Sequence, residues 1–229
     1  MGQLAPRRTV RTIIVLCILG ISYLGGAGGR SGLAATPEPG EKLVGSLCLS
    51  CHRLEGKPLP RSKKKAPDLI GAGSKYQSDW LERWLQDPDI KLYPLGYSVQ
   101  SEGRRRHLSL PADQARQVAA FLSARKDTRV TPGLMQPGTL EQLDRGAQIF
   151  KEQECHSCHL TPASTPRGYI GGMSSTSFIG ISKRLQADWV YRFNKSPDDF
   201  EPDSGVPRPN PPLSDDDLFA LSAFMMTLR

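Results

Sequence analysis

Aromatic side chains are scarce in this chain of 229 residues: Phe, Trp and Tyr make up 7% of it, and all hydrophobic residues together 38%. That is modest for a chain of this length, so we expect a bound cofactor to supply part of the core. No window alternates apolar and polar residues as a strand would. Glycine and proline are plentiful, with 22 and 19 residues, which predicts many loops between short helices.

Long apolar runs are also lacking, apart from one near the N-terminus. Arg7, Arg8 and Arg11 lead into the apolar residues 13–24, and small residues follow as far as Ala35. This order is typical of an export signal. The run is shorter than the ~20 residues of a spanning helix, although extending it through the following glycines approaches that length. We therefore assign residues 1–35 to a signal peptide or, alternatively, to an N-terminal anchor.

An internal repeat organises the rest of the chain. One copy covers residues 36–126 and the other residues 138–229, with a linker at 127–137 that contains two prolines and a glycine. Three pairs of segments align, at offsets of 107, 109 and 103 residues: Cys48-Leu49-Ser50-Cys51-His52 with Cys155-His156-Ser157-Cys158-His159, Asp79-Trp80-Leu81-Glu82-Arg83-Trp84 with Asp188-Trp189-Val190-Tyr191-Arg192-Phe193, and residues 110–122 with 213–225.

Helical spacing surrounds these aligned segments. Gly40 and Val44 precede the first cysteine pair, and Gly146 and Phe150 the second, so each copy places a small and a large residue on one helix face. The tryptophan segments and the last segment of each copy also show apolar residues at i, i+3 and i+4. We expect an all-α fold with at least three helices in each copy.

The repeated Cys-x-x-Cys-His motif carries the chemistry. Two thiols at this separation can bond to the two vinyl groups of a haem, and the adjacent imidazole can ligate its iron. A structural zinc site or a thioredoxin-like pair also uses such cysteines, but neither explains the adjacent histidine in both copies. The predicted covalent attachment residues are Cys48, Cys51, Cys155 and Cys158, and the predicted proximal iron ligands are His52 and His159.

Both copies resemble class I cytochromes c over nearly their whole length. That family has a helix with a glycine before the attachment motif, then a Pro-x-Leu-x-Gly-like loop, a helix with tryptophan, and a last helix with an aromatic residue. The first copy has Pro67-Asp68-Leu69-Ile70-Gly71, and the second a weaker Phe178-Ile179-Gly180. The resemblance implies two class I cytochrome c-like domains in tandem, each holding one covalently bound haem c.

The sixth iron ligands depart from the family's pattern, which places a methionine on the loop before the last helix. Neither copy has one there. The first copy has His107, which predicts bis-histidine ligation and a lower reduction potential. Alternatively, His107 is a surface residue, and Lys91, Tyr93 or Tyr97 ligates the iron in its place. The second window, residues 196–212, contains no His, Met, Lys or Cys, so its haem is either five-coordinate or bound by an outside residue such as Met173.

The net charge of +7 is unevenly divided. Residues 1–35 carry +4, residues 36–126 carry +6 and residues 127–229 carry −3. With the export signal removed, the chain is basic in its first half and acidic in its second. This pattern does not indicate nucleic-acid binding. A charge dipole instead suits a protein that is oriented between two redox partners.

These observations predict a dihaem c-type cytochrome that transfers electrons in the periplasm between a donor and an acceptor protein. It would act as a free carrier or as a subunit of a membrane complex of a respiratory chain, with membrane contact through the N-terminus and inner-membrane anchoring as an alternative. A dihaem oxidoreductase or a gas-binding sensor with an open second haem remains a further alternative. We expect an electron-transfer protein rather than a stand-alone enzyme.

Overall fold

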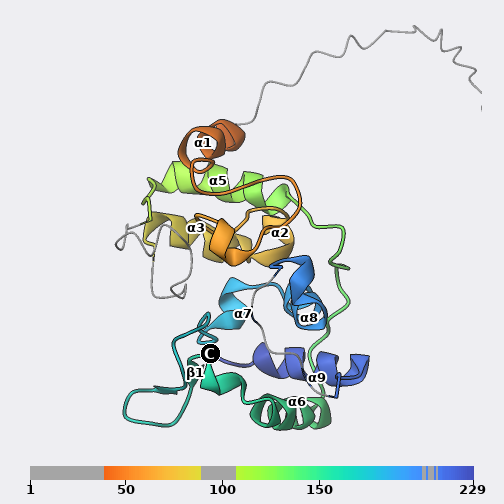
Figure 1. The fold of residues 1–229 in the computed structure, drawn as a ribbon. Helices are drawn as coiled ribbons and strands as arrows, with labels where there is room; N and C mark the ends of the chain where they lie inside the picture. Colours follow the sequence, from red (N-terminus) through yellow and green to blue (C-terminus); the bar gives the residue numbers. More distant parts are fainter. Residues whose placement is uncertain (1–38, 89–106, 203–204, 206–208, 210) are drawn as a thin grey trace, which may run out of the picture. The chain divides into compact units, whose positions relative to one another are not determined.

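The structure is a computed structural model that describes residues 39–88, 107–202, 205, 209 and 211–229 (Figure 1). The predicted signal or anchor at residues 1–35 lies outside the described residues, as do Lys91, Tyr93 and Tyr97. Within the described ranges, no helix combines the length and apolar character needed to cross a membrane. The chain divides into two units, Met1–Thr36 and Pro37–Arg229, and every described element belongs to the second.

Helices dominate both repeats, as the apolar spacing predicts. The first repeat contains α1 (Pro39–Leu47), α2 (Ala72–Lys75), α3 (Ser78–Gln86) and α5 (Ala112–Ala124). The second contains α6 (Leu140–Glu152), α7 (Ile181–Arg184), α8 (Ala187–Lys195) and α9 (Asp215–Met225). Short 3-10 turns lie at Arg61–Lys63, Cys155–Ser157 and Pro197–Asp199. One small antiparallel hairpin, β1 (Thr161–Pro162) with β2 (Tyr169–Ile170), was not expected from the sequence.

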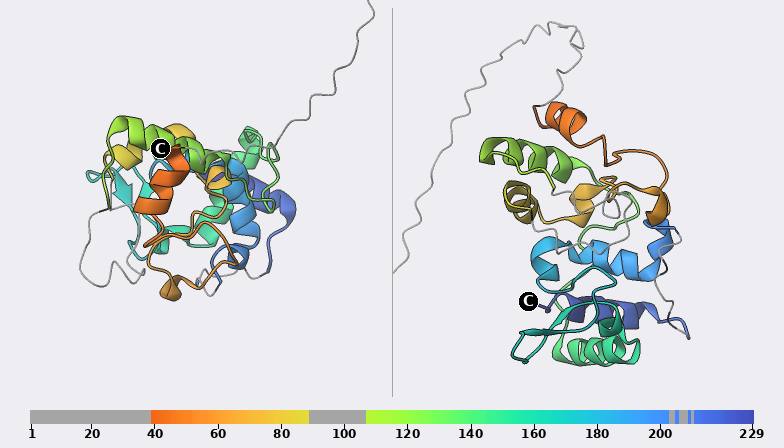
Figure 2. Two further views of the ribbon diagram at one scale, coloured as in Figure 1. Left: turned by 90° about the horizontal axis from the view of Figure 1, so that it is seen from above. Right: turned by 60° about the vertical axis from the view of Figure 1, so that its left-hand side comes forward.

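In each repeat the first helix packs against the last one. Helix α1 lies across α5, and α6 runs beside α9 (Figures 1 and 2). A Cβ atom on Gly40 would stand 2.2 Å from the backbone oxygen of Gln117, and one on Gly146 would stand 2.1 Å from that of Ala220. Only glycine fits such an approach, so in each repeat the first helix packs closely against the last one.

Local sequence signals set where the helices begin. Thr139 and Gln142 form a capping box at the start of α6, in which each side chain bonds to the other residue's backbone N–H. Ser214 precedes α9 and its hydroxyl accepts the N–H of Asp217. The carboxylate of Asp217 in turn forms an ion pair with Arg145 of α6, with 2.8 Å between Oδ1 and Nε. This ion pair ties the start of α9 to α6.

The segment between the repeats is packed rather than loose. Val130 and Met135 are buried, with 5% and 9% of their surface exposed. The carboxylate of Asp188, at the start of α8, accepts the backbone N–H groups of Gly133 and Met135, both at 2.7 Å. The predicted linker is therefore fixed to the second repeat by two charge-assisted hydrogen bonds.

Candidate functional site

In the first repeat, the Cys-x-x-Cys-His segment follows directly from the end of α1. The N–H of Cys48 bonds to Val44, and the N–H groups of Cys51 and His52 both reach the carbonyl of Cys48, at 3.1 and 2.9 Å. This turn gathers the two thiols and the imidazole on one short segment. The half-buried cysteines form no disulfide, and burial raises the pKa of the Cys48 thiol.

The attachment segment of the second repeat forms the same turn and is also contacted by the residues that follow β2. The N–H of His159 bonds to the carbonyl of Cys155 at 3.2 Å, and burial raises the pKa of the Cys155 thiol to about 11. Residues after β2 press against this segment from outside. A Cβ on Gly171 would stand 2.2 Å from the carbonyl oxygen of His159, and one on Gly172 would stand 2.1 Å from that of Ser157. These glycines let the hairpin strand touch the backbone of the attachment segment.

Each predicted proximal histidine is oriented by a backbone carbonyl. Nδ1 of His52 lies 2.7 Å from the oxygen of Pro67, and Nδ1 of His159 lies 2.5 Å from that of Thr176. A carbonyl can only accept, so Nδ1 carries the proton and Nε2 keeps its lone pair for a metal. Burial lowers the pKa of both imidazoles, with the two carbonyl bonds opposing it. Both rings are therefore neutral at pH 7, as metal ligation requires.

His107 lies close to His52. The two ring centroids are 6.0 Å apart, and the ring centroid of Trp84 in α3 lies 4.5 Å from that of His107. A metal–imidazole bond is about 2 Å long and the ring centre lies about 1 Å beyond the nitrogen, so two axial imidazoles on one metal place their ring centres roughly 6 Å apart. Burial lowers the pKa of His107. The separation suits a single iron between two neutral imidazoles.

The second repeat shows a different environment around its histidine. The ring of Phe178 stacks on His159, with centroids 3.9 Å apart and an angle of 11°. Met173, the predicted outside ligand, is 76% exposed. Met225 is buried and receives the Asn194 amide at 3.4 Å. Asn210, which aligns with His107, lies outside the described residues. Met173 therefore stays a prediction that the geometry leaves untested.

The donor set fits an iron held by a porphyrin better than a metal held by protein alone. Across the residues that the structure describes, no group of three or more His, Cys, Asp or Glu side chains could hold a metal ion. Each site instead offers two thiols and one oriented imidazole, and the first adds a facing imidazole. A haem supplies four equatorial nitrogens, so it needs only such axial ligands from the chain.

Sequence reasoning singled out all of these histidines and cysteines but missed their supports. The acceptor carbonyls of Pro67 and Thr176 belong to the residues just before Asp68-Leu69 and Ser177-Phe178, at the same offset of 109 as the tryptophan segments. Extending the aligned segments toward the N-terminus would have paired these carbonyls. The Gly171-Gly172 pair carried a second signal, because adjacent glycines often mark a close backbone approach.

A comparison with known protein families identifies the family of the chain. A family model described as cytochrome c matches the chain twice, over residues 37–126 and 143–229. Each match lies within one copy of the repeat and contains one complete Cys-x-x-Cys-His segment. Comparison with curated proteins and with solved structures gave no match.

Proposed function

Because the chain belongs to the cytochrome c family, whose domains serve haem-based electron transfer, we propose that it is a two-haem electron-transfer protein acting in the periplasm. Each repeat binds one haem c through thioether bonds. When bound, haem c supplies an iron that takes up and releases one electron at a time. The observation that carries the proposal is that each matched region holds its own oriented attachment histidine.

In the first repeat the chain's own residues set both axial positions. Cys48 and Cys51 would hold the porphyrin, and His52 and His107 would ligate its iron. The 6.0 Å between the two ring centres supports this assignment, and Trp84 packs against His107 and restrains its rotation. Two imidazoles donate more electron density than an imidazole and a thioether, so this haem has a lower potential than a His/Met site.

In the second repeat Cys155, Cys158 and His159 would hold the haem. Phe178 stacks on the His159 ring and restrains its plane. The segment from 196 to 212 supplies no His, Met, Lys or Cys. The two haems therefore have different axial environments, and we propose that they differ in potential. Such a difference suits stepwise passage of electrons from a donor protein to an acceptor protein.

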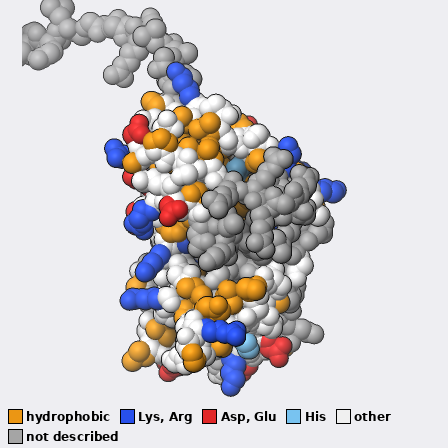
Figure 3. Space-filling view, turned by 90° about the vertical axis from the view of Figure 1, so that its left-hand side faces the viewer, with side chains coloured by type: hydrophobic (Ala, Val, Ile, Leu, Met, Phe, Trp, Pro, Cys, Tyr) orange, Lys and Arg blue, Asp and Glu red, His pale blue; other side chains and the backbone are white. Residues whose placement is uncertain are grey.

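Surface features support docking to other proteins. Figure 3 shows hydrophobic side chains lying beside Lys and Arg side chains on one face. Two exposed leucines flank Cys48 in the first attachment segment, Leu47 at 39% and Leu49 at 45%, and Tyr169 and Ile170 are exposed on the hairpin that touches the second. An apolar surface near a haem, surrounded by charged side chains, suits short-lived complexes between electron-transfer proteins. The donor and acceptor belong to a soluble pathway or to a membrane respiratory complex.

Removing one pair of attachment cysteines tests the two-haem assignment. We expect each double variant to hold one covalent haem per chain, because the two attachment segments belong to separate repeats. Cys155→Ala/Cys158→Ala should keep the haem of the first repeat, and Cys48→Ala/Cys51→Ala should keep that of the second. Covalent haem is measured by absorbance of the alkaline pyridine complex and by the mass of the denatured chain. The unchanged protein should hold two. The assignment would be contradicted if Cys155→Ala/Cys158→Ala kept two haems, or if it lost both haems while the first repeat stayed folded.

A further inference from the structure

The two repeats touch each other through equivalent residues. Tyr76 pairs with Leu185 in an antiparallel bridge, and these positions differ by 109 residues, the offset that aligns the tryptophan helices. Both lie at the corner between a four-residue helix and the helix that bears the tryptophan, α2–α3 in one copy and α7–α8 in the other. The contact is therefore self-complementary, like the twofold interface of a homodimer.

Two glutamines make this contact reciprocal. The backbone N–H of Gln77 donates to the carbonyl of Arg184, and that of Gln186 donates to the carbonyl of Lys75, both at 2.9 Å. Their side-chain amides repeat the exchange: Nε2 of Gln77 donates to Leu185 and Nε2 of Gln186 donates to Tyr76, both at 3.1 Å. Each glutamine thus makes two hydrogen bonds to the opposite repeat.

Glutamine is an unusual residue at these positions. Gln77 and Gln186 are the N-cap residues of α3 and α8, where Ser, Thr, Asp or Asn would normally accept a bond from the helix's own backbone. Neither glutamine side chain caps its own helix. Both copies therefore lack the stabilisation of a side-chain N-cap, and the glutamine amide instead donates to the opposite repeat. A departure from a local rule that occurs twice at equivalent positions points to a role in the assembled chain.

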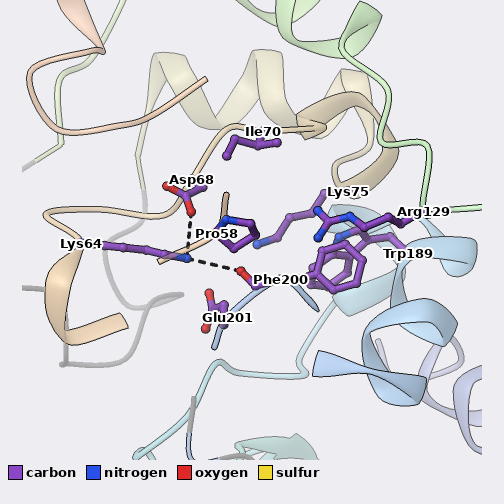
Figure 4. A pocket seen from close by; sticks show the side chains of 9 residues that line it. All are labelled: Pro58, Lys64, Asp68, Ile70, Lys75, Arg129, Trp189, Phe200 and Glu201. Atoms are coloured by element: carbon purple, nitrogen blue, oxygen red, sulfur yellow. Dashed lines mark hydrogen bonds and ion pairs between the residues drawn. The ribbon is translucent and has the colours of Figure 1, made fainter. Parts of the chain in front are cut away.

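Charged side chains around one pocket add further contacts between the repeats (Figure 4). Nζ of Lys75 lies 4.6 Å from the ring centre of Trp189 in the opposite repeat. Figure 4 shows buried Lys64 between Asp68 of its own repeat, at 3.0 Å, and the backbone oxygen of Phe200 in the other, at 3.4 Å. Arg129, from the segment between the repeats, covers the ring of Phe200 at 4.4 Å.

We propose that Gln77 and Gln186 form a reciprocal clamp that locks the two haem-binding repeats into one rigid body and fixes the separation of the two haems. The proposal rests on the two-haem function proposed above. The clamp lies at the starts of α3 and α8, the helices that bear Trp80 and Trp189. Because electron transfer depends steeply on distance, a fixed separation keeps exchange between the two haems fast. Gln77 and Gln186 are positioning residues in this scheme.

Proline tests the clamp without disturbing either helix. The φ angles of Gln77 and Gln186 are −69° and −76°, which proline adopts. The preceding residues have extended backbone, as a residue before proline requires. In Gln77→Pro/Gln186→Pro, all four cross-repeat donors are gone. Gln77→Ala/Gln186→Ala removes only the two amides. Gln148→Ala is the matched control, because its amide bonds only to Glu152 of the same helix.

We expect the full-length unchanged protein and Gln148→Ala to unfold in a single calorimetric transition. The double proline variant should unfold in two, with faster proteolysis within residues 127–137, and the double alanine variant should lie between them. After partial reduction in a rapid flash, electron exchange between the haems should slow at least tenfold in the proline variant. Two transitions in the unchanged protein, or one unaltered transition and an unaltered exchange rate in the proline variant, would overturn the clamp. Haem content, measured on the same samples, separately reports a failure of the two-haem assignment.

Discussion

In the reduced protein, His107→Ala is expected to bind one more carbon monoxide per chain than the unchanged protein. The imidazole of His107 faces that of His52 with 6.0 Å between ring centres, so its removal opens the sixth position of the first haem. Carbon monoxide binds ferrous haem only where such a position is free. Titration of the reduced protein by visible difference spectroscopy counts the sites, and comparison of the two proteins cancels any site on the second haem.

His156→Ala is the matched control, because His156 lies between the attachment cysteines of the other repeat and should leave the count unchanged. His107→Met should restore a six-coordinate iron and raise the potential of the first haem by on the order of 0.1 V, within the ~0.8 V range that axial ligands span. Equal carbon monoxide binding by His107→Ala and the unchanged protein would show that His107 is a surface or packing residue and not a ligand.

Two glycines of α1 are expected to respond to alanine in opposite directions. A Cβ on Gly40 would stand 2.2 Å from the backbone oxygen of Gln117 in α5, whereas one on Gly45 would meet nothing within 4 Å. Gly40→Ala must push α1 away from α5, at a cost of about 1–3 kcal/mol or more in the free energy of unfolding. Gly45→Ala should stabilise the same helix by up to about 1 kcal/mol, the difference in helix propensity.

The measurement is the thermal unfolding of both variants, followed by circular dichroism. Gly40→Ala should lower the midpoint by roughly 5–10 °C and Gly45→Ala should raise it by a few degrees. Gly146→Ala, whose Cβ would approach Ala220 equally closely, should behave like Gly40→Ala. If Gly40→Ala and Gly45→Ala shift the midpoint equally, the contact between α1 and α5 is looser than described and this packing argument fails.

The longer helices and the attachment residues could be predicted from sequence because their signals are local. A Gly–Val or Gly–Phe pair at i and i+4 marks a helix face, and Cys-x-x-Cys-His is a continuous motif. His107 was predicted in the same way, from its place just before α5. The short helices α2 and α7 have four residues each, too few for any periodic signal. The strands β1 and β2, with two residues each, were not predicted for the same reason.

The contacts between the repeats could not be predicted from local pattern. Gln77 and Gln186 have no unusual neighbours, and their partners are backbone carbonyls that any residue could supply. Their recurrence at an offset of 109 is visible in the sequence, but it does not say that each amide crosses to the other copy. That depends on how two folded surfaces fit together.

A redox titration of the purified full-length protein, with haem counted on the same sample, tests the central claim most directly. The account predicts two covalent haems per chain and two reversible one-electron steps of different potential, because the proposal gives the first iron two imidazole ligands and the second iron a different environment. One haem per chain, or haems that do not reduce and reoxidise reversibly, would contradict a two-haem electron-transfer protein.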